Sequence, residues 1–466
     1  MESPACFRAR FGSKRVIWQS YYSCYCLGMT EHVPLEIVLA MDEGLDTDAI
    51  AQRTGIRFCA IEGTSGWRET FSEQALDELA PAYGTKLSGW LAAEPQHEWI
   101  ALSPVPGECL ARFCSERGVP CSVLPWERHV WFGSKANLHA AVAELDLPRL
   151  AGRWLDLQGA RYGELAQEFG GRFVIQGEHG ADGSSTAVVH NAETFALAAG
   201  RFAGGAVWAT PYAGTLSLNV NAIATPAGTA VAYPSVQITG KRELGSSQTG
   251  HCGNDFSATA TLAGKLLECV RLQTSRLGSW MAARGYRGLF GLDFVVEERS
   301  GRPCVVDINP RWQGSTSLQS QAAHRKTLAP VSAIEAAYMA GVLEAAEVMA
   351  LSDSLYEPVE GAQFFLKATG IGPWRVSRGL EPGIYTRDLT FIRPALELSE
   401  TISRDEILIN GHNPRPGSRI CGGARLLRVC ATERMVDPST GRLEDWVCDV
   451  IFRLGAALGL EQCPAS

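Results

Sequence analysis

Short apolar runs alternate with helical patterns through the first 125 residues. The runs at 15–18, 35–39, 98–102 and 120–125 are typical of strands, and segments of helical periodicity separate them. Strands that alternate with helices predict a parallel sheet. No G-x-G-x-x-G motif occurs here, so the pattern does not support a dinucleotide-binding domain.

Hairpins and amphipathic helices replace this alternation after about residue 126. Residues 136–145 have a helical pattern, and the β-rich runs 172–176 and 187–189 flank a small-residue loop at 180–186. The alternation at 216–222 predicts a half-buried strand that pairs with a later strand through a turn containing Pro and Gly. These elements predict a domain of a different kind from the first.

The last third of the chain combines a helical segment with short strands. Residues 331–351 are Ala-rich and helical, and residues 361–466 show many short strands separated by turn signals. A polar, glycine-rich stretch at 246–256 is expected to be a mobile loop near the substrate. A chain of 466 residues is expected to form about three domains. We therefore expect the domains to span residues 1–125, 126–325 and 326–466.

Composition excludes several classes of partner. The net charge is −8, from 42 basic and 50 acidic residues, and no basic run occurs, so a nucleic-acid partner is not expected. The apolar stretch 336–351 is broken by Glu344 and Glu347, and the first 30 residues lack the apolar core of a signal peptide. The 14 cysteines are scattered rather than paired, which favours a reduced, cytoplasmic protein without a membrane segment.

The most informative segment is a predicted β-hairpin around residues 288–311. If its turn centres on Ser300, Asp293 lies opposite Asp307, and Asn309 shares their face because residues i and i+2 point the same way. Two carboxylates at a cross-strand position destabilise a hairpin unless a cation lies between them, and Mg²⁺ prefers such oxygen ligands. Arg311 adds a fixed cation suited to a carboxylate. The alternative is that D-x-N-P is ordinary turn chemistry.

These residues, followed by Gly314-Ser315-Thr316, resemble the metal-binding end of the ATP-grasp superfamily, of the carboxylate–amine ligase type. Asp307 stands where that family usually has Glu. The resemblance implies an α/β fold with a pre-ATP-grasp parallel domain, a two-lobed ATP-grasp domain, and a smaller, mostly-β C-terminal region. It also implies that Asp293, Asp307 and Asn309 bind Mg²⁺, with Mn²⁺ as a substitute, and that Arg311 is catalytic.

The same resemblance implies a nucleotide site upstream of the hairpin. The residues expected to bind ATP are Lys135, Gln176, Gly180, Gly183, Ser184, Ser185, Thr210, Tyr212 and Lys241. Gln176 stands where the family usually has a second Lys, so Lys241 and Arg242 are candidates to supply the missing charge. The hinge beside the adenine, around Thr210 and Tyr212, lacks the acid often found there. The loop at 180–186 is expected to be a flap that is mobile without nucleotide.

The implied activity is ATP-dependent ligation of a carboxylate to an amine through an acyl phosphate, which yields ADP and phosphate. The expected substrates are small molecules, namely amino acids or short peptides, and the default assembly is a homodimer. One alternative is a biotin-carboxylase-like or carbamoyl-phosphate-type enzyme, although 312–315 reads W-Q-G-S where biotin carboxylases carry V-E-H. Another is a nucleotide-binding protein that has lost catalysis. We also expect Asp307→Asn to relieve repulsion from Asp293 in the metal-free protein.

Overall fold

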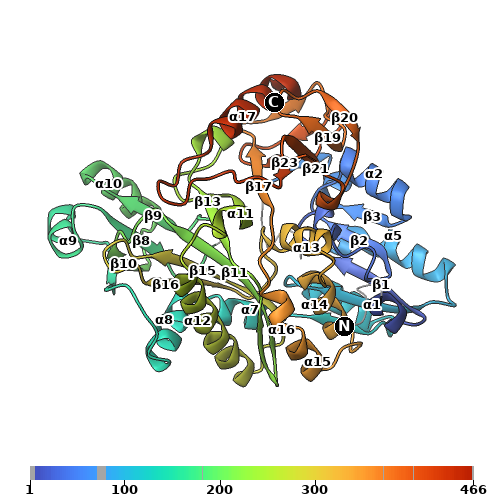
Figure 1. Ribbon diagram of the computed structural model, residues 1–466, viewed down its shortest axis with the longest axis horizontal. Coiled ribbons are helices and arrows are strands. Elements are labelled where there is room, and N and C mark those ends of the chain that lie inside the picture. The colour runs from blue at the N-terminus through green and yellow to red at the C-terminus, as the bar shows by residue number, and fades with distance from the viewer. Residues whose placement is uncertain (1–5, 71–79, 181, 371, 402, 464–466) are drawn as a thin grey trace.

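The structure is a computed structural model of the chain and describes residues 6–70, 80–180, 182–370, 372–401 and 403–463 (Figure 1). In the view of Figure 1 the N-terminal sheet lies at the right, a small antiparallel sheet lies at the left, and the C-terminal strands lie at the top. No helix within these ranges has the length and apolar character needed to cross a membrane.

Five parallel strands form the N-terminal sheet, in the order β3-β2-β1-β5-β6. The predicted parallel sheet is therefore present, and the strand that the sequence pattern missed is the short β3. Its carboxyl edge, where open α/β sheets bind ligands, faces the rest of the molecule through Tyr21, Tyr22 and Asp42. The elements are α1 (Cys6–Arg10), β1 (Lys14–Gln19), η1 (Ser23–Cys26), β2 (Leu35–Ala40), α2 (Leu45–Thr54), β3 (Arg57–Ala60), α3 (Ile61–Ser65), β4 (Trp67–Arg68), α5 (Ala80–Ala93), β5 (Glu98–Ser103), α6 (Glu108–Ser115) and β6 (Cys121–Val123).

A small antiparallel sheet, in the order β7-β10-β8-β9, carries the predicted flap between β8 and β9. The apolar residues of β8 and β10 pack against the helices α9 and α10 and give this lobe its own core. The elements are α7 (Trp126–Phe132), α8 (Lys135–Glu144), β7 (Arg153–Asp156), α9 (Tyr162–Phe169), β8 (Phe173–Gly177), β9 (Thr186–Val189), α10 (Ala192–Arg201) and β10 (Ala206–Pro211).

One large sheet runs through the second half of the chain. Its order is β16-β15-β11-β13-β14-β17-β23-β21-β19-β20, and β12 pairs with β11. The strands are β11 (Ser217–Thr225), β12 (Gly228–Val231), β13 (Ser235–Thr239), β14 (His251–Asp255), β15 (Gly288–Val296), β16 (Pro303–Asn309), β17 (Ala362–Lys367), β19 (Gly383–Thr386), β20 (Phe391–Pro394), β21 (Glu406–Gly411) and β23 (Arg425–Ala431). Because β14 pairs with β17, the sheet continues across residue 325. The domain boundaries drawn from the sequence stay a prediction.

A fourth sheet joins the two ends of the chain, because β4 of the N-terminal part pairs with β22 in the order β24-β18-β22-β4. Its other strands are β18 (Trp374–Val376), β22 (Arg419–Ile420) and β24 (Leu460–Gln462). The remaining elements are η2 (Arg242–Leu244), α11 (Phe256–Thr259), α12 (Gly264–Ala283), α13 (Thr316–Arg325), α14 (Val331–Met339), α15 (Ala345–Ala350), α16 (Ser352–Leu355), η3 (Leu398–Glu400) and α17 (Asp445–Leu458).

Three expectations about elements are wrong. Residues 251–255 of the expected loop form the buried strand β14, between β13 and β17. The helical segment 331–351 is divided between α14 and α15. The strand β11 is buried on both faces, because the polar face that the alternation assigned to solvent lies against α13 and the site, where it carries Asn219 and Asn221.

Candidate active site

A cavity of about 480 Å³ lies between the N-terminal sheet, the small antiparallel sheet and the large sheet, and most of the predicted site residues line it. An adjoining cavity of about 520 Å³ shares part of its wall, including Asp307, Asn309 and Arg311. The first cavity is lined by the predicted residues Lys135, Gln176, Gly180, Gly183, Ser185, Thr210, Tyr212, Lys241, Asp293, Asp307, Asn309 and Arg311. Ser184 lines the second cavity instead. The sequence therefore located the cavity, while the roles assigned to these residues stay predictions.

The hairpin β15–β16 places the two acids as expected, with Asp293 paired to Asp307 across the strands. A β-bulge at Val306 contributes to this register, because Phe294 pairs with Val305 and Val306 has no partner across the strands. The bulge shifts the pairing by one residue between the turn and the acids. Asn309 pairs with Gly291 and turns its side-chain amide to the Oδ2 atom of Asp293, at 3.2 Å.

Asp293 is surrounded by amide groups. The side-chain amides of Asn219, Gln237 and Gln313 donate to its Oδ1 atom at 2.7, 2.9 and 3.3 Å. Loss of solvent around Asp293 raises the pKa of its carboxyl to about 6, and repulsion from Asp307 adds to this shift, while the bonds from Asn219 and Asn309 oppose it. Asp293 therefore carries a carboxylate that is costly to keep charged without a cation.

Asp307 is held differently from Asp293. The ammonium of Lys135 contacts its Oδ1 atom at 2.6 Å, and Lys135 itself is only 2% exposed. Lys135 opens helix α8, where Ser134 caps the helix by accepting the amide of Asn137. The predicted repulsion between the two acids is present, since Asp307 raises the pKa of Asp293, but Lys135 supplies a positive charge at Asp307 that the prediction did not include.

The donor set of the hairpin fits Mg²⁺. Two facing carboxylates and the amide of Asn309 are hard oxygen donors of the kind that Mg²⁺ takes together with phosphate oxygens. In addition, the buried Oε1 atom of Gln313 has no hydrogen-bond partner among the described residues. Within those residues no group of three or more His, Cys, Asp or Glu is placed to hold a metal. A metal here would therefore need phosphate oxygens to complete its ligands.

The flap between β8 and β9 is fastened to the large sheet. The Oδ2 atom of Asp182 accepts from the ammonium of Lys367 at 2.7 Å, and its Oδ1 atom accepts the backbone amide of His251 at 3.2 Å. Although burial raises the pKa of Asp182, Lys367 and Arg425 lower it below its usual value. The hydroxyl of Thr249 also donates to the carbonyl of Gly183, at 3.0 Å. Gly183 has φ +75° and no room for a Cβ, which would lie 2.1 Å from the Thr249 carbonyl oxygen.

Glu178 occupies the N-terminus of helix α8. Its carboxylate accepts the hydroxyl of Ser134 and the backbone amide of Ala136, and its carbonyl accepts the amide of Lys135. Backbone amides at a helix N-terminus favour an anion. The flap therefore supplies its own carboxylate at the end of the helix that carries Lys135.

The expected adenine hinge is the end of strand β10. Thr210 is buried, and the guanidinium of Arg172 lies over the ring of Tyr212, 3.6 Å from its centroid. Gln176 pairs with Trp208 across β8 and β10 and lines the cavity. The ammonium of Lys241 donates to the carbonyl of Gly441, so this cation lies in the cavity wall with one bond already made.

Several residues of the site were missed by the sequence analysis. They are Tyr21, Tyr22, Asp182, Asn219, Gln237, Gln313, Lys367 and Arg425. The alternation of β11 was a usable signal for Asn219, because polar side chains on a strand next to the acid pair would face the same side. No local pattern marked Arg425 or Lys367, which reach the cavity through the pairing of β17 with β23.

Comparisons with known proteins agree with this geometry. A family model described as the ATP-grasp domain matches residues 161–315. A search of curated protein sequences finds no match. The fold is similar to carboxyaminoimidazole ribonucleotide synthase from Aspergillus clavatus complexed with ATP, with a TM-score of 0.53 and 12% identity over 95% of this chain and 99% of that chain.

Two further solved structures are similar over most of both chains. One is the biotin carboxylase domain of 2-oxoglutarate carboxylase from Hydrogenobacter thermophilus with MgADP and bicarbonate, with a TM-score of 0.57 and 14% identity over 90% of this chain and 86% of that chain. The other is phosphoribosylamine–glycine ligase from Thermotoga maritima, with a TM-score of 0.54 and 13% identity over 96% of this chain and 98% of that chain. Residues 161–315 are an ATP-grasp domain, as the resemblance predicted, and the predicted α/β fold class is confirmed.

Proposed function

We propose that the protein is an ATP-dependent carboxylate–amine ligase that uses Mg²⁺ and acts on small molecules such as amino acids or short peptides. The observation that carries the proposal is the facing pair Asp293 and Asp307 in a cavity that Arg311 also lines. The ATP-grasp domain at residues 161–315 supports it, and one of the similar structures is named as a ligase.

The residues of the hairpin hold the metal and the reacting group in this proposal. Asp293, Asp307 and Asn309 bind Mg²⁺, which when bound neutralises charge on the phosphate oxygens of ATP. Arg311 steadies the acyl phosphate and the oxyanion that forms when the amine attacks. Phosphoryl transfer needs positioning and charge neutralisation more than a protein nucleophile, so these fixed charges suffice.

The flap and helix α8 complete the nucleotide side of the proposed site. Lys135 binds the phosphates, together with the backbone amides of the loop 180–186, and Tyr212 lines the adenine hinge. The closed flap keeps water from the acyl phosphate, which would otherwise hydrolyse. Gln176 brings a neutral donor to the place where the family usually has a charge.

The direct test is a screen for ADP and phosphate release over pairs of carboxylates and amines, with Mg²⁺ present and product masses recorded. The proposal expects at least one pair that yields ADP, phosphate and an amide. An Arg311→Met variant serves as the blank for contaminating ATPases. Release of AMP and pyrophosphate, or turnover that is the same without an amine, would contradict it.

A carboxylase of the biotin-carboxylase type is the second candidate, and the similarity to a biotin carboxylase domain favours it. The residues after Arg311 argue against it, because Trp312 is fully buried and its indole donates to Glu335. Gln313 follows, and its amide is turned to Asp293. These residues place no carboxylate where a carboxylation base would stand. Bicarbonate-dependent ADP release with no amine present would favour the carboxylase.

A further inference from the structure

A pair of cations faces the cavity from the C-terminal strands. Arg425 on β23 pairs directly with Lys367 on β17, so two positive side chains stand at one cross-strand position. Like charges at such a position destabilise a sheet unless an opposite charge lies between them. The pair Asp293 and Asp307 is the counterpart with the opposite charge.

The two cations differ in what they contact. Lys367 has its anion, because its ammonium lies 2.7 Å from Asp182. Arg425 is only 8% exposed, yet within the described parts of the chain it forms no ion pair and its one hydrogen bond runs from Nη1 to the hydroxyl of Tyr25, at 3.0 Å. The carboxylate of Asp182 acts on Arg425 through its charge, but its bond goes to Lys367. The remaining N–H groups of the buried guanidinium have therefore lost water and gained no charged acceptor.

Aromatic rings fix the orientation of Arg425. Its guanidinium carbon lies 3.9 Å from the ring centroid of Phe365 and 4.6 Å from that of Tyr22. A guanidinium carries its N–H groups along its edges, and two of them can donate to one carboxylate in parallel. Arg425 lines both cavities, so its side chain is within reach of a ligand bound there.

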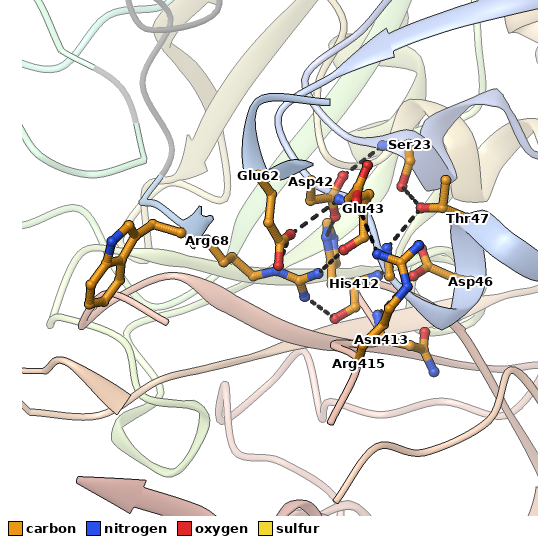
Figure 2. Close-up of polar contacts among 12 residues, drawn as sticks. Ser23, Asp42, Glu43, Asp46, Thr47, Glu62, Arg68, His412, Asn413 and Arg415 are labelled. Atoms are coloured by element: carbon orange, nitrogen blue, oxygen red, sulfur yellow. Dashed lines mark hydrogen bonds and ion pairs between the residues drawn. The ribbon is translucent and has the colours of Figure 1, made fainter. Parts of the chain in front are cut away.

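The ring of Tyr22 packs in turn against His412. The ring of His412 packs edge-on against it at 4.5 Å, and His412 is bonded through Nδ1 to Asp42 at 2.8 Å. Figure 2 shows the polar contacts around His412, in which Arg68 donates to Glu62 and to the carbonyl of His412. These contacts join the carboxyl edge of the N-terminal sheet to the loop after β21, and they position the aromatic wall against which Arg425 lies.

We infer that Arg425 binds a non-reacting carboxylate of one substrate. One of the two substrates therefore carries an anionic group in addition to the groups that are joined. The inference rests on the proposed ligase activity, in which Arg311 already serves the carboxylate that is activated. Each arginine lies over the ring of one of two consecutive tyrosines, since Arg311 is 5.5 Å from the ring centroid of Tyr21 and Arg425 is 4.6 Å from that of Tyr22. In this proposal Arg311 serves the reacting carboxylate and Arg425 serves the anchoring carboxylate.

The test compares Arg425→Met with Arg68→Met in the full chain. Arg68 is a matched control, because it is 3% exposed at the same junction but has its acceptors in Glu62 and two backbone carbonyls. Thermal unfolding is followed with saturating MgADP, in succinate and in its neutral analogue succinamide. We expect succinate, and not succinamide, to raise the Tm of the wild type and of Arg68→Met, and to leave that of Arg425→Met unchanged. Without succinate, Arg68→Met should unfold at a lower temperature than the wild type, and Arg425→Met at an equal or higher temperature than the wild type.

Other results overturn the inference. They are a wild type that does not respond to succinate, an Arg425→Met variant that responds as the wild type does, or an Arg425→Met variant that is destabilised without anions as much as Arg68→Met. Once a substrate pair is known, Arg425→Met should raise the KM of one organic substrate at least about 30-fold while that of MgATP changes little. A rise in the KM of MgATP instead would assign Arg425 to the nucleotide. If succinate binds through Arg425 but no pair is ligated, the proposed function fails and the anion site remains.

Discussion

The contact between Lys135 and Asp307 decides what a substitution at Asp307 does to the protein without metal. Because Lys135 is buried and its ammonium lies 2.6 Å from Asp307, Asp307→Asn leaves a buried charge without its anion. Asp307 keeps 24% of its side chain exposed, so the loss is moderated by solvent. We expect the free energy of unfolding to fall by about 1–3 kcal/mol.

A double-mutant cycle isolates that contact. Lys135→Met and Asp307→Asn are measured alone and together by urea unfolding without metal. Coupling of the same order is expected, because the double variant removes both charges. Both single variants should lose Mg²⁺-dependent ADP release. If Asp307→Asn is more stable than the wild type, repulsion from Asp293 outweighs the pairing with Lys135.

Arg311 gives a second prediction for a single residue. Arg311→Lys should preserve MgATP binding and lower kcat for ligation about 10-fold or more, because Lys keeps the charge but loses the two-pronged donor that fits a planar carboxylate. The measurement pairs a nucleotide-binding titration with product formation. The matched control is Arg287→Lys, since Arg287 donates to the carbonyls of Ala282 and Tyr286, which lie outside the cavity. Full activity of Arg311→Lys would show that its charge alone is used.

The flap is an element whose order depends on few contacts. Asp182 forms an ion pair with Lys367 and accepts the amide of His251. Asp182→Asn therefore removes the negative charge of this ion pair and keeps the size of the side chain. Hydrogen exchange of residues 177–186 without nucleotide should be faster in the variant than in the wild type, and MgATP should protect the flap in both. The turn at 298–301 is the internal reference. Equal exchange in variant and wild type would show that the charge of Asp182 does not hold the flap in place.

The hairpin shows how far a sequence pattern predicts an element. The apolar runs and the turn were enough to place Asp293 opposite Asp307, and β-hairpin geometry placed Asn309 near both. The bulge at Val306 was not predictable, because it depends on packing around the strands rather than on the residue itself. The error at 251–255 has the same origin, since a polar, Gly-rich stretch becomes a strand only when β13 and β17 cover it.

Side chains brought together by distant strands lie beyond such patterns. Lys367 and Arg425 are far apart in sequence and meet only because β17 pairs with β23. Lys135 was predicted to touch phosphate, and its contact with Asp307 required knowing how helix α8 sits beside β16. The nucleotide residues were found because they follow one another in a fixed order along the chain, whereas the anchoring cation on the C-terminal strands has no such order.

At the scale of the whole molecule, buried carboxyls make stability depend on pH. Burial raises the pKa of Glu335 to about 7, and its bonds from Trp312 and the Leu289 amide oppose the shift only in part. A raised folded-state pKa means that the contribution to stability is complete below the unfolded value near 4.5 and is lost as pH rises through about 7. Glu335 thus favours folding in acid and opposes it at neutral pH and above.

The Glu335→Gln variant tests this sign, because it keeps the size of the side chain without its charge. Relative to the wild type, its free energy of unfolding should rise with pH between 5 and 8 by up to about 3 kcal/mol. Glu347→Gln is the control, since hydrogen bonding lowers the pKa of this exposed carboxyl and it stays ionised over that range. A difference that does not change with pH would show that Glu335 stays charged or neutral throughout.

The pairing of β14 with β17 also determines where the chain can be divided. A fragment ending near residue 325 would keep β14 but lose β17, and so expose a row of unpaired N–H and C=O groups along a buried strand. Such a fragment of residues 126–325 should form aggregates in light scattering, while a fragment extended through β23 to residue 463 should scatter less. An exchange of nucleotide lobes between relatives therefore has to cut around the small sheet β7-β10-β8-β9, whose strands pair only with one another in the part of the chain that the structure describes. That lobe can be exchanged between relatives as a unit, whereas the strands of the large sheet have to be exchanged together.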